Sequence, residues 1–100
     1  MVHVIAIVTT QPGTRSQFLD VYRANLPLVL AEQGCIAYEA VVDVPGPGFT
    51  AFGPDVFVVV ERWASLADLQ AHAVAPHMKA YRANVKAFHV STVVHVLQAA

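Results

Sequence analysis

The segment at residues 56–63, VFVVVERW, begins with five apolar side chains in a row before its first charged residue. It is rich in β-branched residues and too short for a typical helix, so it predicts a β-strand. Successive side chains of a strand point to opposite faces of its sheet, and an unbroken apolar run therefore indicates burial on both faces. Any fold for this chain must cover both sides of the sheet that contains this strand.

Three other segments have the same character and predict the remaining strands, at Val2–Thr9, Cys35–Val44 and His89–Gln98. The connection at residues 45–55, PGPGFTAFGPD, holds three prolines and three glycines and predicts a loop. It is longer than a compact hairpin requires. Its glycines do not follow a phosphate-binding pattern, so we expect a mobile lid or a loop at the edge of a dimer.

The segment between the first two predicted strands has the pattern of an amphipathic helix. Apolar residues recur at spacings of three and four, at Phe18, Tyr22, Leu26, Val29 and Leu30. Residues 14–17, TRSQ, have the form of a capping box, and Gly34 is a natural helix stop. Pro27 interrupts the pattern and predicts either a kink or the start of a shorter second segment.

A second helical region follows the strand VFVVVERW. Ser65 is placed to cap a helix from Leu66 to about Ala73. Pro76 then opens another helix, since proline favours the first helical position. The apolar residues along one side of that helix are Met78, Tyr81, Val85 and Phe88. This region supplies the second half of the helical layer.

The predicted order is β-α-β-β-α-β in a single domain that spans residues 1–100. This order is typical of an α+β, ferredoxin-like fold, in which a four-stranded antiparallel sheet carries its helices on one face. One helical layer leaves the other sheet face uncovered, and 56% of the residues are hydrophobic while only 13% are charged. Because such an apolar face must be buried, we expect a homodimer formed through the sheet face.

Charge and cysteine content narrow the classes of function. The six basic and seven acidic residues form no basic cluster, which argues against nucleic-acid binding. No apolar run reaches the ~18 residues of a membrane helix, and the first ten residues lack the features of a signal peptide. The single cysteine, Cys35, excludes an internal disulfide or a CxxC site and is expected to be a small buried hydrophobe. We therefore expect a cytoplasmic protein.

Two histidines, His72 and His77, follow the third predicted strand. They are five residues apart with Pro76 between them, which does not place them on one helix face, so no metal site is predicted. His77 is expected to be a solvated residue at a helix start. His72 lies three residues after Leu69 and can border the same apolar face, as a general base or a hydrogen-bond donor. A partly buried structural histidine is an equally good interpretation.

His3 and His95 form a second candidate pair. If the first and last strands are antiparallel neighbours, a register that pairs residue 3 with residue 95 sets the two imidazoles opposite one another near one end of the sheet. Trp63 ends the third strand, and its flat ring can either pack in the core or line the pocket of an aromatic ligand.

Residues 61–78, ERWASLADLQAHAVAPHM, resemble the signature of the antibiotic biosynthesis monooxygenase (ABM) superfamily. In that signature an acidic residue and a Trp end a strand, and a capped short helix closes in His before a Pro-His pair. Residues 32–40, EQGCIAYEA, resemble the Glu-Pro-Gly-Cys-x-x-Tyr segment of the same family, with Gln33 in place of the proline. QPG before the first helix also matches. The resemblance implies a dimeric α+β barrel whose sheets pack against each other.

The resemblance also implies an activity. Better-known members of the family oxidise aromatic polyketides or hydroquinones with dioxygen, and they use no metal, flavin or haem. By this resemblance His72 is the catalytic candidate, in a pocket for a small aromatic substrate. The expected substrate-binding residues are Trp63, Leu69, His77, His3 and His95.

Haem-degrading relatives carry an asparagine on the first strand, a tryptophan on the second-helix segment and a haem-ligating histidine. Here the first strand has no asparagine, His72 occupies the helix position and Arg82 lies near the ligand position, so haem degradation is disfavoured. Three hypotheses follow: a cofactor-free monooxygenase, a non-catalytic dimeric module that binds a small apolar ligand, and a structural dimer with a filled core. A pocket around Trp63 and His72 that a histidine enters would favour the enzyme.

Overall fold

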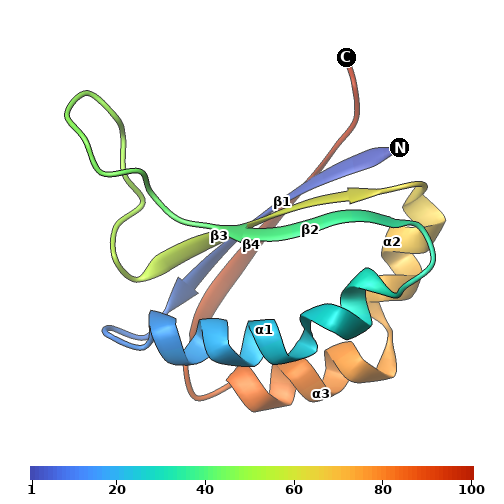
Figure 1. The fold of residues 1–100 in the computed structure, drawn as a ribbon, viewed down its shortest axis with the longest axis horizontal. Coiled ribbons are helices and arrows are strands. Elements are labelled where there is room, and N and C mark those ends of the chain that lie inside the picture. Colours follow the sequence, from blue (N-terminus) through green and yellow to red (C-terminus); the bar gives the residue numbers. More distant parts are fainter.

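The computed structural model describes residues 1–100 and contains one four-stranded antiparallel sheet. Its strands are β1 (Val2–Thr10), β2 (Cys35–Val41), β3 (Val56–Trp63) and β4 (His89–Leu97). Their spatial order is β2-β3-β1-β4, so β3 and β1 are central and β2 and β4 form the edges (Figure 1). The unbroken apolar run thus occupies a central strand of the sheet.

The helices are α1 (Arg15–Leu30), α2 (Leu66–Ala73) and α3 (Pro76–Val85). All three lie on one side of the sheet, with α1 and α3 side by side and α2 at the end where β3 finishes (Figure 1). None of them is long and apolar enough to span a membrane. The observed order is β-α-β-β-α-α-β, because the second helical region consists of two helices. The predicted ferredoxin-like α+β fold is confirmed.

Two clusters of buried side chains fill the space between the sheet and the helices. The larger contains Ala6, Val8, Phe18, Tyr22, Phe57, Val59 and Val85. The smaller contains Val4, Val29, Trp63 and Met78, and Leu69 of α2 packs against it. Only 15 of the 100 residues are buried, so much of the apolar content of the chain remains at its surface.

The starts of α1 and α2 differ in how they are capped. The Ser65 hydroxyl accepts a hydrogen bond from the backbone N–H of Asp68 (3.1 Å), which confirms Ser65 as the cap of α2. The predicted capping box at Thr14 is wrong, because its hydroxyl donates to the carbonyl of Gln11 (2.8 Å) and no side chain caps α1. The turn before α1 presents that carbonyl to the hydroxyl, so the side chain faces the turn rather than the helix amides.

Three predicted boundaries also change. Phe88, expected along the last helix, lies beyond the end of α3 at Val85. α1 continues through Pro27 as one helix, so the second segment that Pro27 could have started is absent. The second strand ends at Val41 rather than Val44, since Val41 is its last residue paired with β3. Beyond this point the chain makes its hydrogen bonds to the loop that follows, and the strand ladder stops.

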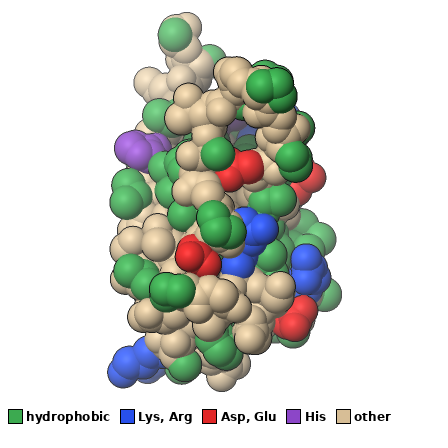
Figure 2. Space-filling model, turned by 90° about the vertical axis from the view of Figure 1, so that its left-hand side faces the viewer, with side chains coloured by type: hydrophobic (Ala, Val, Ile, Leu, Met, Phe, Trp, Pro, Cys, Tyr) green, Lys and Arg blue, Asp and Glu red, His purple; other side chains and the backbone are tan.

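The connection between β2 and β3 projects away from the helices (Figure 1). At its base the carboxylate of Asp43 accepts hydrogen bonds from the backbone N–H groups of Phe52 and Gly53, both at 2.9 Å. The guanidinium of Arg15 donates to the carbonyl of Val56 at 3.0 Å. Figure 2 shows acidic and basic side chains gathered near the centre of this end of the molecule, with hydrophobic side chains around them. Charged groups therefore hold the base of the loop in place.

The register between β1 and β4 differs from the predicted one. His3 pairs with Leu97 and His95 pairs with Ile5, so the two histidines are diagonal neighbours rather than direct partners. The observed ladder from His3 to Thr9 is regular but lies two residues away from the predicted register, and its one irregularity falls beyond this range, between Thr9 and Thr10. Both histidines lie on the sheet face opposite the helices, because the residues of β1 that alternate with His3 belong to the core.

The centre of this open sheet face is apolar. Ile5 and Ile7 of β1 pair with Val60 and Val58 of β3, and all four side chains share the face. Val60 remains 37% exposed at its centre. β4 is exposed along nearly its whole length, on this face and on the other. The single chain leaves both surfaces available for further contacts.

Gly34 lies where the chain before β2 passes close to α2. It has a φ of +78°, and a Cβ there would collide with the side chain of Asp68. Gly13 has a similar φ of +76° with nothing within 4 Å of the added atom. Gly13→Ala should therefore lower the free energy of unfolding only by the backbone strain, about 1–2 kcal/mol. Gly34→Ala should lower it by more, because the collision adds to the strain. Urea denaturation at one fixed protein concentration measures the difference.

Removal of the obstructing side chain supplies the control for this experiment. Asp68→Ala in the Gly34→Ala background should recover part of the extra loss of stability, because the collision is with that side chain. Equal losses in Gly13→Ala and Gly34→Ala would show that the close approach does not contribute.

Candidate active site

A cavity of about 500 Å³ lies between the helix-covered face of the sheet and helices α2 and α3. Twelve of its 18 lining residues are hydrophobic. The sheet contributes the apolar side chains of Val4, Ala6, Val8, Val59 and Val94. The charged and other polar lining residues are Glu61, His72, Arg82, Lys86, His89 and Thr92. This size and this mixture of many apolar and few polar groups are typical of small-molecule sites.

His72 is the polar residue that α2 contributes to the cavity, and it is only 6% exposed. Its Nδ1 lies 2.6 Å from Oε2 of Glu32, a residue of the connection between α1 and β2. Its ring lies 4.7 Å from the ring of Trp63 and 5.4 Å from that of Tyr38, measured between centroids. These contacts fix the orientation of the imidazole and leave Nε2 as the nitrogen available to a ligand.

The charge state of His72 follows from its burial. Desolvation lowers its pKa below the ordinary value of 6.5, although the hydrogen bond to Glu32 acts in the opposite direction. The ring is therefore mainly neutral at pH 7. Because a carboxylate only accepts hydrogen bonds, the single hydrogen of the neutral ring lies on Nδ1. Nε2 then carries a lone pair and can take a proton from a bound molecule.

Glu61 places a carboxyl group in the same cavity, although the residue is only 5% exposed. Its Oε1 accepts a hydrogen bond from Nε1 of Trp63 at 2.9 Å. Burial raises the pKa of Glu61, while the Trp63 hydrogen bond opposes this shift and the charge of Glu32 adds to it. Glu61 is not among the residues expected from the sequence. The alternation of the strand could have indicated it, because residues 61 and 63 share a face.

Two tyrosines, Tyr38 of β2 and Tyr81 of α3, add phenol groups to the cavity wall. Burial raises the pKa of both well above its ordinary value, so both keep their hydroxyl hydrogen. The ring of Tyr38 stacks on that of Tyr22, with centroids 5.8 Å apart and an angle of 12°. The Tyr22 hydroxyl donates to the carbonyl of Tyr38 (3.2 Å), and burial raises the pKa of Tyr22 to about 12. The cavity thus has two phenol donors beside an imidazole acceptor.

The opposite part of the wall is basic. It is formed by Arg82 and Lys86 of α3, which are exposed, and by His89 and Thr92 of β4. The guanidinium of Arg82 donates to the carbonyl of Ala73 at the end of α2 (2.5 Å). The cavity therefore has an enclosed end with acid and imidazole groups and a more open end with basic groups.

The structure brings only some of the predicted site residues to the cavity. Leu69 and His72 line it. Trp63 is fully buried behind His72, where it supports the imidazole instead of forming the cavity wall. His77 does not line the cavity, and its Nδ1 lies 3.2 Å from Oδ1 of Asn25. The side chain of His77 is 20% exposed, so the expectation of a solvated histidine is wrong.

His3 and His95 lie on the other face of the sheet, which separates them from His72. Cys35 is partly buried against the smaller core cluster, and burial raises the pKa of its thiol. No group of three or more His, Cys, Asp or Glu side chains is arranged to hold a metal ion.

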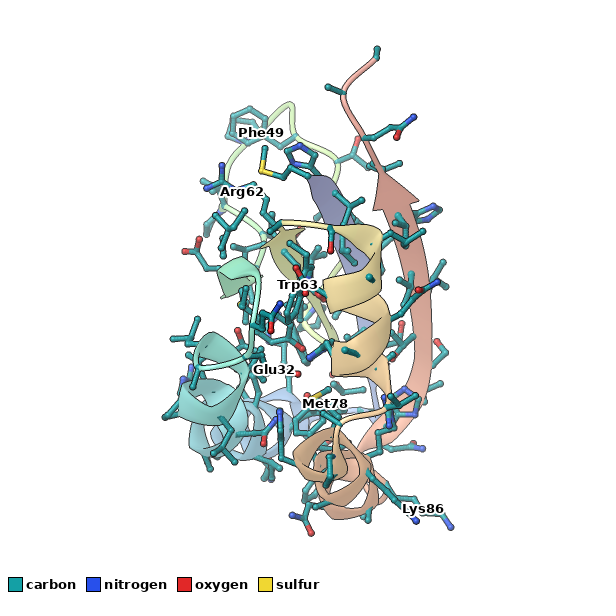
Figure 3. The ribbon with its side chains drawn as sticks, turned by 90° about the vertical axis from the view of Figure 1, so that its right-hand side faces the viewer. Glu32, Phe49, Arg62, Trp63, Met78 and Lys86 are labelled. Atoms are coloured by element: carbon teal, nitrogen blue, oxygen red, sulfur yellow. The ribbon has the colours of Figure 1, made fainter.

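Glu32 is a second residue that the sequence did not single out as part of the site. It belongs to the EQGC segment, which indicates a family but assigns no role to its glutamate. Figure 3 shows Glu32 beside the end of α1, with Trp63 and Met78 at the same end of the molecule. Its contact with His72 joins residues 40 positions apart in the chain.

The fold and the cavity define a small ferredoxin-like α+β domain that can hold an apolar molecule against a neutral histidine. The family model described as antibiotic biosynthesis monooxygenase matches residues 1–84. The chain belongs to this family, as the resemblance of its motifs predicted.

Individual relatives agree with this assignment. The chain is 41% identical to a protein of Escherichia coli strain K12 described as the probable quinol monooxygenase YgiN, over 98% of this chain and 97% of that protein. Among solved structures, Rv0793 from Mycobacterium tuberculosis has a TM-score of 0.80 and 29% identity, and the match covers 99% of this chain and 94% of that one. PA3566 from Pseudomonas aeruginosa has the same fold, with a TM-score of 0.82 at 22% identity, over 99% and 93% of the two chains.

The raised pKa of Glu61 has a consequence for stability. The folded state binds this proton more tightly than the unfolded state, so the ionised carboxylate lowers the free energy of unfolding as pH rises above about 4.5. Glu61→Gln keeps an oxygen that can accept from Trp63 and removes the charge. We expect a higher urea midpoint than wild type at about pH 8, with a gain that shrinks at about pH 4. Asp20→Asn, at an exposed carboxylate of α1, is the control. A lower midpoint for Glu61→Gln at the higher pH would show that the buried charge does not destabilise the fold.

Proposed function

We propose that this protein is a monooxygenase that oxidises a hydroquinone or a polyketide-like aromatic with dioxygen and without a cofactor. The observation that carries the proposal is the placement of His72 in the wall of an apolar cavity, with Nδ1 engaged by Glu32 and Nε2 free. The cavity volume of about 500 Å³ is within the range of small-molecule sites. It suits an aromatic ring system with a few hydroxyl groups.

The first step of the proposed reaction is a proton transfer. A substrate hydroxyl gives its proton to Nε2 of His72 and becomes a phenolate. Tyr38 and Tyr81 keep their hydroxyl hydrogens and can donate to the developing negative charge. Glu61, whose pKa burial raises, is a second group able to exchange a proton with the bound molecule.

The second step is the reaction with oxygen. An electron-rich phenolate transfers one electron to dioxygen, and the two resulting radicals combine to place oxygen on the ring. Loss of water then gives the product, so one hydroquinone and one dioxygen yield one hydroxyquinone and one water. The contribution of the protein is to orient the ring, to accept the proton and to exclude bulk water.

Comparison with the relatives supports the substrate class. The Escherichia coli relative is described as a probable quinol monooxygenase, and it matches nearly the whole chain. Haem degradation has less support, because Arg82 lies near the expected position of the haem-ligating histidine. The guanidinium of Arg82 donates a hydrogen bond to the carbonyl of Ala73 at the end of α2.

The proposed active form is a homodimer joined through the open sheet face. Ile5, Ile7, Val60 and Val93 are neighbouring apolar side chains there, on the side of the sheet that no helix covers (Figure 1). Burial of such a surface against a second copy is favourable by about 25 cal/mol for each Å² of apolar area. Two sheets packed in this way would also cover both faces of β3.

Oxygen uptake tests the proposed activity. Chelator-treated and dialysed wild type should consume oxygen with some members of a panel of hydroquinones and anthrones. His72→Ala should lower kcat/KM at least about tenfold, about 1.4 kcal/mol of barrier, because it removes the proton acceptor. Trp63→Phe should cause a smaller loss, since it removes the Nε1 donor to Glu61 but keeps an aromatic ring behind His72. Gln70→Ala, on the exposed side of α2, is the control.

The absence of turnover above the uncatalysed rate with every substrate would contradict the proposed activity and favour a non-catalytic ligand-binding module. Full activity in His72→Ala would contradict the role of the histidine alone.

Sedimentation velocity tests the proposed dimer. Wild type should sediment at twice the chain mass of 10.8 kDa. Val60→Asp, at the centre of the open face, should sediment as a monomer because the carboxylate would be buried without a partner. Leu28→Asp makes the same kind of change on α1, at a residue that is 54% exposed, and should leave the mass unchanged. A monomeric wild type, or a dimeric Val60→Asp, would contradict the proposed interface.

A further inference from the structure

A single carboxylate oxygen lies between two imidazole rings at the enclosed end of the cavity. Oε2 of Glu32 is 2.6 Å from Nδ1 of His72 and 3.6 Å from Nε2 of His77. The three side chains come from the α1–β2 connection, α2 and α3, and are 16%, 7% and 20% exposed, respectively. His77 does not line the cavity, so it does not contact a bound molecule directly, and its contact with Glu32 connects it to His72.

The hydrogen positions of His77 follow from its neighbours. Nδ2 of Asn25 donates to the sulfur of Met78 at 3.4 Å, which leaves Oδ1 of Asn25 as an acceptor 3.2 Å from Nδ1 of His77. Nδ1 of His77 therefore carries a hydrogen. In a neutral ring Nε2 would then direct a lone pair at Glu32, and this nitrogen is buried with no hydrogen-bond partner. A hydrogen on Nε2 of His77 removes this contact between a lone pair and a carboxylate, and it creates an attraction between the His77 imidazolium and Glu32.

We propose that Glu32 and His77 are positioning residues for His72. Glu32 holds the hydrogen of His72 on Nδ1, and a positively charged His77 balances the carboxylate so that His72 itself remains neutral. Nε2 of His72 is then bare before the substrate binds, and Glu32 stabilises the imidazolium once the proton has been transferred. This inference rests on the proposed role of His72 as proton acceptor.

The other groups that face His72 are compatible with this division of roles. Arg82 of α3 and His77 both oppose a positive charge on His72, whereas Glu32 favours it. Tyr38 contacts the ring and keeps its hydroxyl hydrogen. Glu61 lines the same cavity and accepts a hydrogen bond from Nε1 of Trp63. Glu32 and His77 therefore act on the proton affinity of His72 with opposite signs.

The pH dependence of kcat/KM tests these opposite signs. Glu32→Gln keeps a carbonyl oxygen to accept from Nδ1 but removes the negative charge, so the pKa of His72 should fall and the acid limb should move to lower pH. His77→Gln removes the positive charge, so the pKa of His72 should rise and the acid limb should move to higher pH. Asp20→Asn, at an exposed carboxylate of α1, should leave the profile unchanged. Superimposable profiles, or shifts of both variants in the same direction, would overturn the inference.

Comparison of Glu32→Ala with Glu32→Gln distinguishes the role of Glu32 in orienting His72 from the effect of its charge. Glu32→Ala should lower kcat by about 10- to 100-fold, the effect known for groups that orient metal-bound histidines, because it removes the acceptor that orients His72. Glu32→Gln should retain more of kcat than Glu32→Ala because it still accepts from Nδ1. Circular dichroism establishes that each variant folds, and Glu32→Gln keeps the test decisive if Glu32→Ala does not.

Nitrogen-15 NMR of the imidazole rings gives a reading that does not depend on turnover. In ligand-free wild type at neutral pH, His72 should carry its hydrogen on Nδ1 and show a bare Nε2. This tautomer should persist in Glu32→Gln and give way to a mixture in Glu32→Ala. A hydrogen on Nε2 in wild type would overturn the inference even if the enzyme is active. The expected tautomer in a protein without turnover would contradict only the proposed function.

Discussion

The two-residue repeat of β3 is the constraint on which both the core and the cavity depend. Phe57, Val59, Glu61 and Trp63 all face the helices, because alternate residues of a strand share a face. The first two fill the core, Glu61 enters the cavity and Trp63 supports the ring of His72. A slip of one residue would send all four side chains to the open face, so the same register determines the packing and the chemistry.

Much of the fold could be predicted because its signals are local. Ser65 and Pro76 act on helix starts within a few residues of their own positions, and the starts of α2 and α3 agree with the expected ones. The end of β2 could not be predicted, since it depends on a carboxylate that binds amides nine and ten residues away. The register of β1 against β4 could not be predicted either, because the observed and predicted registers differ by two residues, an offset that keeps every side chain on the same face of the sheet.

The site was harder to predict for the same reason. His72 could be identified from its helical spacing to Leu69, and both residues line the cavity. Its partner Glu32 could not, because that contact joins the connection after α1 to a helix 40 residues later. Trp63 illustrates a related difficulty, since a sequence shows that a large ring is buried but not which side of a neighbouring ring it occupies. Geometry between distant elements decides these roles.

Because β4 is exposed, its residues can change the choice of bound molecule with little effect on the stability of the fold. Thr92 and Val94 line the cavity, yet they belong to an edge strand whose residues are exposed along nearly its whole length. Substitutions at exposed positions usually change stability by less than about 0.5 kcal/mol, whereas those in the buried core cost far more. Mutational drift can therefore reshape one wall of the cavity while the rest of the fold is preserved. Homologues with the same architecture can diverge in the molecules they accept through this strand.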